Sequence, residues 1–222
     1  MSTAWSYSSI KTFEQCPKKY YHLKILKDVK DSGNTATIYG QEVHKAAEYY
    51  VKDGTLIPEK FAYIRPVVES IANKKGTKYT ELKMGVSKTE DGYAPCKFLA
   101  KDVWWRGIAD VVIIDGNTAY SIDYKTSKNA KYADTKQLDL IAGALFTWFP
   151  HLDTIKSALI FLVSNDLIKK DHYREHKDKY LSTFDSGLER LDTAEQTAVW
   201  NAVTGPLCRF CPVVSCEHNT KP

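Results

Sequence analysis

Two short runs of β-branched and aromatic residues on either side of a tight turn constrain the fold more than any other feature of this 222-residue sequence. The runs cover residues 107–114 and 118–124, and the pair Asp115-Gly116 lies between them. Such a pair between two strand-like runs is a strong signal for an antiparallel hairpin, because Gly and Asp tolerate the backbone angles of a tight turn. The sequence therefore predicts two adjacent strands near the middle of the chain.

Polar residues interrupt both runs at positions that the hairpin should bring together. Asp110 lies in the first run, and Asp123 and Lys125 lie at the end of the second. A four-residue loop would place Asp110 directly opposite Asp123, whereas a two-residue loop would pair Asp123 with Ile108. In both registers the carboxylates share one face within roughly 5–8 Å, and Tyr124 points to the other face. An unbulged three-residue loop would instead separate the carboxylates.

Two carboxylates at that separation repel each other unless one is protonated or a cation lies between them. Their hard oxygen ligands suit Mg²⁺ or Mn²⁺. Lys125, on the same face as Asp123, could orient a water molecule or stabilise negative charge on a reacting phosphate. The alternative is an exposed Asp/Lys face whose charges form surface ion pairs.

A second candidate element is the helix predicted over Gly40–Lys52. Gly40, His44 and Glu48 recur every four residues and therefore line one face of this helix. Alone, His44 fits an ordinary helix histidine with a local hydrogen bond. Its functional interest comes from its combination with the carboxylate hairpin.

Gln137 marks a third candidate element, early in the helix that follows the hairpin. Three lysines surround it in the sequence, namely Lys128, Lys131 and Lys136. This group could form a rim that contacts phosphates beside the hairpin. The plain alternative is a solvated loop followed by a helix start.

The five cysteines are distributed unevenly. Cys208 and Cys211 form a CxxC pair, Cys216 follows, and Cys16 lies near the start of the chain. Cys96 has no partner at useful spacing and is expected to be a free thiol. The first residues lack a basic stretch followed by an apolar one, so we expect no secretory signal and a cytoplasmic location. A reducing compartment argues against structural disulfides.

The remaining segments alternate between helical and strand-like patterns, and Ser8 or Ser9 is expected to cap the first helix. Helices are expected over 8–26 with an interruption at Pro17, 40–52, 59–74, 132–149 and 181–203. Strands are expected over 79–86, 98–104, 107–114, 118–124, 155–163 and 168–174, the last as an edge strand. This order indicates one α/β or α+β domain with helices on a mixed central sheet. Within a single domain 1–222, we expect a helical segment 1–76, a core 77–175 and a C-terminal segment 176–222.

The composition fits a globular domain. Hydrophobic residues make up 43% of the chain and charged residues 26%, and no run of about 18 apolar residues is present, so no membrane span is expected. Residues 1–30 hold six lysines against two acidic residues, which matches the net charge of +4 of the whole chain. A basic, tyrosine-rich segment suits a polyanion, because lysines neutralise phosphates. A solvated helix face is the alternative.

In combination, these motifs resemble those of the PD-(D/E)XK nuclease superfamily, in its RecB-like branch. That branch includes the nuclease domains of RecB and AddB and the CRISPR-associated adaptation nucleases. The matching motifs are Ser6-Tyr-Ser8 with Phe13-Glu-Gln-Cys16-Pro-Lys-Lys-Tyr20, Gly40-x3-His44-x3-Glu48, Gly107-Ile-Ala-Asp110, Asp123-Tyr-Lys125 and Gln137-Leu-Asp-Leu-Ile141. Each motif alone is weak, but their order and spacing are specific. Ile141 stands where the family often has a tyrosine, so a DNA contact from that position is not expected here.

The resemblance implies a restriction-endonuclease-like α/β fold, in which helices flank a mixed central sheet. Members of this branch can carry a four-iron, four-sulfur cluster bound by one N-terminal and three C-terminal cysteines. Cys16, Cys208, Cys211 and Cys216 occupy those places, so a [4Fe-4S] cluster would join the two ends of the chain. Zinc is the less favoured alternative, with His218 as a ligand if Cys16 does not bind.

The resemblance also implies roles for individual residues. The groups expected to bind one or two Mg²⁺ or Mn²⁺ ions are His44, Asp110, Asp123 and the carbonyl oxygen of Tyr124. The expected catalytic set is Asp110, Asp123, Lys125 and His44. Glu48 and Glu81 are expected as accessory groups, and the residues expected to contact DNA are Gln137, Tyr20, Lys18 and Lys19.

Together these implications predict a metal-dependent DNA exonuclease, rather than an endonuclease, acting on single strands or duplex ends. Its role would be in recombination, repair or degradation of DNA. Two alternatives stay open. One is a non-catalytic nucleic-acid-binding protein on a nuclease scaffold, and the other is a nuclease subunit that works only with a helicase or recombination partner.

Overall fold

The computed structural model describes residues 4–31, 33, 35–131 and 133–220. The chain divides into two compact units. Unit 1 combines residues 1–33 with residues 184–222, and unit 2 contains residues 34–183. The two ends of the chain therefore belong to the same unit. The start of the helix predicted from residue 132 lies outside the described residues.

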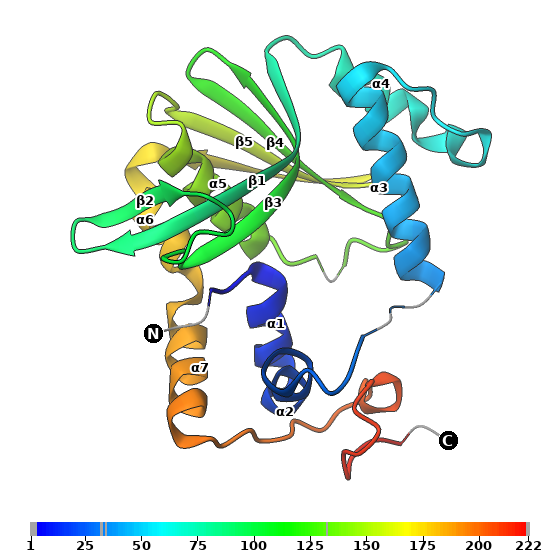
Figure 1. The fold of residues 1–222 in the computed structure, drawn as a ribbon. Coiled ribbons are helices and arrows are strands. Elements are labelled where there is room, and N and C mark those ends of the chain that lie inside the picture. The colour runs from blue at the N-terminus through cyan, green and yellow to red at the C-terminus, as the bar shows by residue number, and fades with distance from the viewer. Residues whose placement is uncertain (1–3, 32, 34, 132, 221–222) are drawn as a thin grey trace. The chain divides into compact units, whose positions relative to one another are not determined.

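Figure 1 shows the elements of both units. The helices of unit 1 are α1 (Tyr7–Gln15), α2 (Pro17–Tyr20), a π-helix (Tyr21–Leu26), α7 (Asp185–Thr197) and a 3₁₀ turn (Cys208–Phe210). Those of unit 2 are α3 (Thr35–Asp53), a 3₁₀ helix (Glu59–Ile64), α4 (Arg65–Ala72), α5 (Lys136–Trp148), a 3₁₀ turn (Arg174–His176) and α6 (Lys177–Leu181). A further 3₁₀ turn spans Ser182–Phe184. The strands are β1 (Thr77–Thr89), β2 (Gly92–Cys96), β3 (Trp105–Asp115), β4 (Thr118–Lys125), β5 (Thr154–Phe161) and β6 (Asp166–Tyr173).

The six strands form one mixed sheet in the order β2-β1-β3-β4-β5-β6. Strands β4 and β5 run parallel, and every other neighbouring pair is antiparallel. This arrangement confirms the predicted mixed sheet and the edge position of β6. The parallel pair arises because α5 crosses over between β4 and β5, as parallel strands require a long connection.

The hairpin β3–β4 has one of the two registers that the sequence allows. Backbone pairing runs from Asp115 with Thr118 to Val111 with Ile122. Gly116 turns the chain with a φ of 61°, a left-handed conformation that glycine adopts without steric cost. Continued by one residue, this register places position 110 opposite position 123.

The strand predicted over residues 98–104 is wrong. This segment forms turns, closed by hydrogen bonds from Ala100 N to Lys97 O and from Val103 N to Ala100 O. The strand that pairs with this end of β1 is instead β2, whose glycine and proline disfavour a strand on sequence grounds. Proline is tolerated there because β2 is an edge strand.

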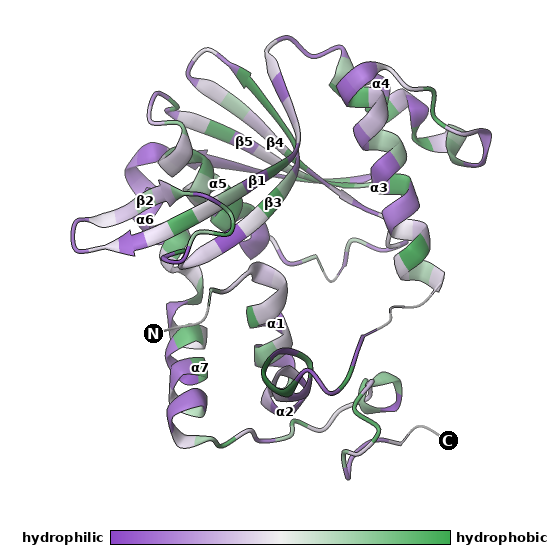
Figure 2. Cartoon of the chain, viewed as in Figure 1, coloured by the Kyte–Doolittle hydropathy of each residue, from purple (hydrophilic) through white to green (hydrophobic). Residues whose placement is uncertain are grey.

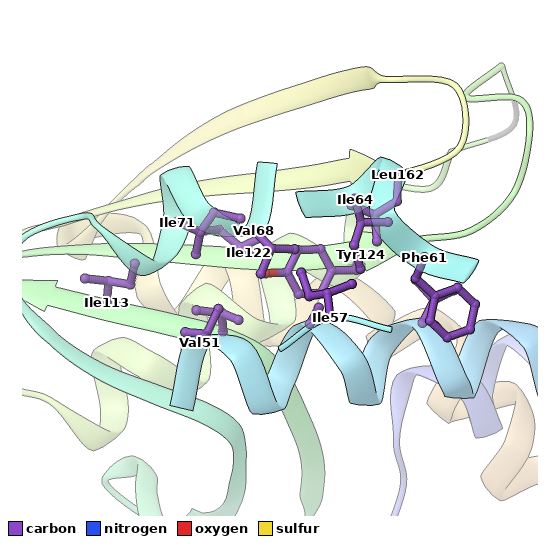
Figure 3. Packing of buried hydrophobic residues seen from close by; sticks show 13 residues of the cluster. Val51, Ile57, Phe61, Ile64, Val68, Ile71, Ile113, Ile122, Tyr124 and Leu162 are labelled. Carbon is purple, nitrogen blue, oxygen red and sulfur yellow. The ribbon is translucent and has the colours of Figure 1, made fainter. Parts of the chain in front are cut away.

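Each face of the sheet carries its own helices. Side chains of α3 and α4 pack on one face against Val111, Ile113, Ile122 and Tyr124. Figure 3 shows the ring of Tyr124 among the aliphatic side chains of this cluster. On the other face Leu138 of α5 packs against β5. Alternation along β4 therefore directs Tyr124 into one core and Asp123 toward α5.

Unit 1 is built on aromatic contacts between its two chain segments. Trp5 and Tyr7 pack against Phe184, and Tyr20 stacks on Trp200. α7 mixes hydrophilic and hydrophobic residues along its length, as expected for a helix buried on one face (Figure 2). In the described residues no helix is long and apolar enough to cross a membrane.

The first helical segment differs in detail from the prediction. Its N-cap is Ser6, which exchanges capping hydrogen bonds with Ser9, whereas the sequence suggested Ser8 or Ser9 as the cap. The helix stops at Cys16, whose backbone is extended. Pro17 then begins a new helix, where its missing N–H costs nothing.

Candidate active site and cysteine cavity

A groove of about 560 Å³ crosses unit 2 between α3 and the central strands. The predicted helix face lines it with Gly40, His44 and Glu48. Glu81 of β1 and Asp110 of β3 add two carboxyl groups to the lining. The structure therefore brings the helix motif and the first hairpin carboxylate to one site.

Asp110 lies where the β3–β4 ladder ends. Its Oδ2 atom accepts a 2.8 Å hydrogen bond from the backbone N–H of Tyr124 and lies 3.3 Å from Nδ1 of His44. Burial by itself would lower the pKa of His44, but hydrogen bonding and the charge of Asp110, with a contribution from Asp123, raise that pKa above its ordinary value. The helix and the hairpin are thus linked electrostatically.

The second hairpin carboxylate is clamped by two side chains. Lys125 Nζ lies 2.5 Å from Asp123 Oδ2, and Gln137 donates from Nε2 to Asp123 Oδ1 at 2.6 Å. Gln137 also accepts a 3.0 Å hydrogen bond from Lys125 at its Oε1 atom. One amide therefore connects the carboxylate and the lysine predicted to work together.

Asp123 sits in an unfavourable place for a lone negative charge. Burial and the charge of Asp110 raise the pKa of Asp123, Lys125 and His44 lower it, and together these effects bring it to about 6. Its Oδ2 atom is buried and receives no well-directed hydrogen bond among the described residues, although the ammonium group of Lys125 is close. Extra positive charge at this position would stabilise the ionised carboxylate.

Glu81 has an unusual backbone conformation. Its φ of 49° lies in the left-handed region, and the β1–β3 pairing skips this residue between Thr80 and Leu82. Burial raises the pKa of the Glu81 carboxyl, and the charges of Asp110 and Glu48 add to that rise. A strained non-glycine residue at a charged groove is characteristic of functional sites.

Two features of the site are not predicted by the sequence. Thr126, directly after Lys125, lines the groove, and a Cβ atom added to Gly40 would lie 3.0 Å from its Oγ1. Gly40 therefore allows α3 to approach the end of β4. The second feature is the dual role of Gln137, which faces Asp123 and Lys125 rather than an outer rim.

The donor set suits a hard divalent cation. Carboxylate oxygens are typical ligands of Mg²⁺ or Mn²⁺, and a cation beside buried Asp123 would stabilise its charge. In the described ranges, however, no three His, Cys, Asp or Glu side chains are already arranged to hold one metal ion. Lys125 and Gln137 hold Asp123, and the Tyr124 N–H holds Asp110.

A second cavity, of about 260 Å³, lies in unit 1. Its lining includes four cysteines and one histidine, namely Cys16, Cys208, Cys211, Cys216 and His218. The Sγ atoms of Cys16 and Cys208 both contact the backbone of Val203, at 3.4 Å from its N and 3.9 Å from its O. The N-terminal cysteine and the C-terminal cysteines therefore share one site, whereas Cys96 belongs to β2 of unit 2.

The predicted DNA contacts of unit 1 are only partly available. Tyr20 is 4% exposed and packs against Phe13 and Trp200, so its ring cannot stack on a base. Lys18 pairs with Glu217 at the C-terminal end. Lys19 contacts Gln15 at 3.3 Å on the surface.

Comparison with known proteins identifies the superfamily of the chain. The model of the PD-(D/E)XK nuclease superfamily matches residues 4–216, and the chain belongs to this superfamily. No curated protein matches the chain.

Solved structures show a similar fold. The crystal structure of a protein named SSO0001 matches with a TM-score of 0.50 at 14% identity, over 99% of this chain and 88% of that one. A protein from Eubacterium rectale, described as a putative exonuclease, matches with a TM-score of 0.55 at 13% identity. The match covers 97% of this chain and 88% of that one. At such identities the likeness concerns the fold alone.

Proposed function

We propose that the chain is a Mg²⁺- or Mn²⁺-dependent DNA exonuclease of the RecB-like branch. One observation carries this proposal, the convergence of Asp110, Asp123 and Lys125 at the open end of the β3–β4 hairpin, with His44 beside them. Superfamily membership supplies the reaction class, hydrolysis of phosphodiester bonds. The exonuclease mode rests on the motif resemblance and is the part that needs direct testing.

Each residue of the site would have its own role in hydrolysis. Asp110, Asp123 and His44, with the Tyr124 carbonyl, would hold the divalent ion, and Glu81 and Glu48 would be accessory groups. A bound ion would polarise the scissile phosphate and lower the pKa of the attacking water. Lys125 would orient that water or stabilise the charge that develops on the phosphate. Gln137 bridges Lys125 and Asp123, which also form a direct ion pair.

Lysine and glutamine residues would guide the DNA. Gln137 is close enough to the reacting groups to contact a backbone phosphate as well as Asp123, and Lys18 and Lys19 would contribute positive charge in unit 1. Salt dependence is the expected signature, because each neutralised phosphate releases counterions.

The test is digestion of matched linear and circular DNA, single- and double-stranded, with Mg²⁺ or Mn²⁺. We expect linear substrates to be degraded from their ends while circular substrates of the same strand type persist. Cleavage of circles at a similar rate would identify an endonuclease. Binding without cleavage of any substrate would support the non-catalytic scaffold, and cleavage only after addition of a helicase or recombination partner would support the subunit alternative.

We further propose that Cys16, Cys208, Cys211 and Cys216 bind a [4Fe-4S] cluster. The support is that all four line one cavity in unit 1. Zinc with His218 is the alternative that metal analysis would reveal.

A further inference from the structure

A buried polar network lies beside the candidate active site and takes no part in the chemistry above. His172 of β6 is fully buried, and Ser157 and Asp139 are nearly so. His172 Nε2 lies 2.8 Å from Asp139 Oδ1, and its Nδ1 lies 3.2 Å from Ser157 Oγ. Lys170 adds its ammonium group to the same carboxylate, 2.6 Å from Oδ1 and 2.9 Å from Oδ2.

Ser157, His172 and Asp139 contact one another in the same order as the serine, histidine and aspartate of a serine hydrolase. Burial excludes that activity, because Ser157 is 2% exposed and a substrate cannot reach its hydroxyl. A satisfied polar network in a protein interior instead fixes the relative placement of the elements that it joins. Here those elements are α5, β5 and β6.

The network holds the beginning of α5, where Gln137 lies. Asp139 follows Gln137 by two residues. Thr135 provides no side-chain cap for this helix, and Asp134 Oδ1 accepts a 2.9 Å hydrogen bond from the backbone N–H of Lys136 at its start. The neighbouring Leu138 packs on Leu159 and Phe161. Such apolar contacts are non-directional, so they allow the first turn to slide or rotate more freely than a set of directed hydrogen bonds does.

The contacts of Gln137 are sensitive to a shift of α5, because its side-chain amide donates one hydrogen bond and accepts another. It donates to Asp123 at 2.6 Å and accepts from Lys125 at 3.0 Å. Hydrogen bonds of this kind have donor–acceptor distances of about 2.7–3.2 Å. A displacement of α5 by about 1 Å would therefore break one or both, and errors of this size at an active site can cost about 100-fold in rate.

We propose that Asp139, held by His172 and Lys170, is a positioning residue that fixes the first turn of α5 so that Gln137 can connect Asp123 with Lys125. This proposal rests on the nuclease function proposed above. Burial by itself would raise the pKa of Asp139, but the hydrogen bonds from His172 and Lys170 lower it below its ordinary value. The anchor is therefore ionised when the enzyme works at neutral pH.

The first test uses a matched pair of lysines on β6. Lys170 faces the anchor, whereas Lys169 alternates to the other face and is exposed. We expect Lys170→Met to lower kcat with an unchanged KM for DNA, Lys170→Arg to restore kcat, and Lys169→Met to match the wild type. Equal kcat values for Lys170→Met and Lys169→Met would contradict the proposal.

The second test asks whether Asp139 acts through Gln137. Asp139→Asn is expected to lower kcat by about 10- to 100-fold, the usual effect of removing a group that orients an active-site side chain. In a Gln137→Ala background the same substitution should have little further effect. Independent, multiplicative losses in the double variant would show that Asp139 supports the fold alone.

A third measurement does not depend on cleavage. The side-chain amide signal of Gln137 in ¹H–¹⁵N NMR should shift in Asp139→Asn and Lys170→Met but not in Lys169→Met. An unshifted signal in both anchor variants would overturn the positioning role. If the wild type cleaves no DNA while the amide signal shifts as expected, the proposed function fails and the positioning of Gln137 stands.

Discussion

Tyr124 shows how one residue can connect the candidate site with the core. Its neighbours Asp123 and Lys125 face the site, while its own ring is 1% exposed and packs between the sheet and the helices α3 and α4. The hydroxyl of Tyr124 is buried and finds no hydrogen-bond partner in the part of the chain that the structure describes. Burial and the charge of Asp110 hold the pKa of this phenol far above its ordinary value.

We therefore expect Tyr124→Phe to preserve or increase stability. Burying a hydroxyl without a partner costs about 1–3 kcal/mol, and phenylalanine keeps the rest of the ring. The free energy of unfolding from urea titration is the measurement, with Tyr124→Ala, which should cost about 3–5 kcal/mol through its cavity, as the contrasting variant. A clear loss of stability in Tyr124→Phe would show that the hydroxyl is satisfied.

At the scale of elements, the packing around Gly107 explains why the motif Gly-Ile-Ala-Asp begins with glycine. Positions 105 and 107 share one face of β3, and the ring of Trp105, 1% exposed, lies directly over Gly107. A Cβ atom at Gly107 would overlap two atoms of that ring. The glycine is thus required by packing three residues before Asp110.

Gly107→Ala should consequently destabilise the protein. The buried ring cannot move without disturbing the core, and overpacking of this kind costs about 1–3 kcal/mol. Gly205→Ala is the matched control, because a Cβ atom there meets nothing within 4 Å. The melting temperatures of the two variants are the measurement. Equal melting temperatures would mean that the Trp105 ring can move away from the added Cβ atom at little cost.

The sequence predicted those elements whose signals are local. Alternation and an Asp-Gly turn were enough to predict the β3–β4 hairpin. Four-residue spacing was enough to predict the face of α3 that bears His44. The strand β2 was missed because its pairing with β1, rather than its own residues, stabilises it. The bridge by Gln137 and the anchor at Asp139 join residues that are distant along the chain, so only the folded structure reveals them.

At the scale of the whole molecule, the proposed metal cluster would link the N-terminal and C-terminal segments of unit 1. Such a link would constrain the unfolded chain and therefore stabilise the folded one. Protein purified without oxygen should be brown and contain iron and sulfide in equal amounts. Cys16→Ser should lose the colour and melt at a lower temperature, whereas Cys96→Ser, the same change in unit 2, should do neither. A colourless wild type containing zinc would replace the cluster with a zinc site.

The most direct test of the central claim compares two aspartates of the same hairpin. Asp123 is clamped by Lys125 and Gln137, whereas Asp115 is exposed at the turn. With end-labelled linear DNA and Mn²⁺, Asp123→Asn should lower the cleavage rate by at least about 100-fold, and Asp115→Asn should cleave like the wild type. A folded Asp123→Asn variant that cleaves at the wild-type rate would contradict the assignment of this hairpin as the nuclease centre.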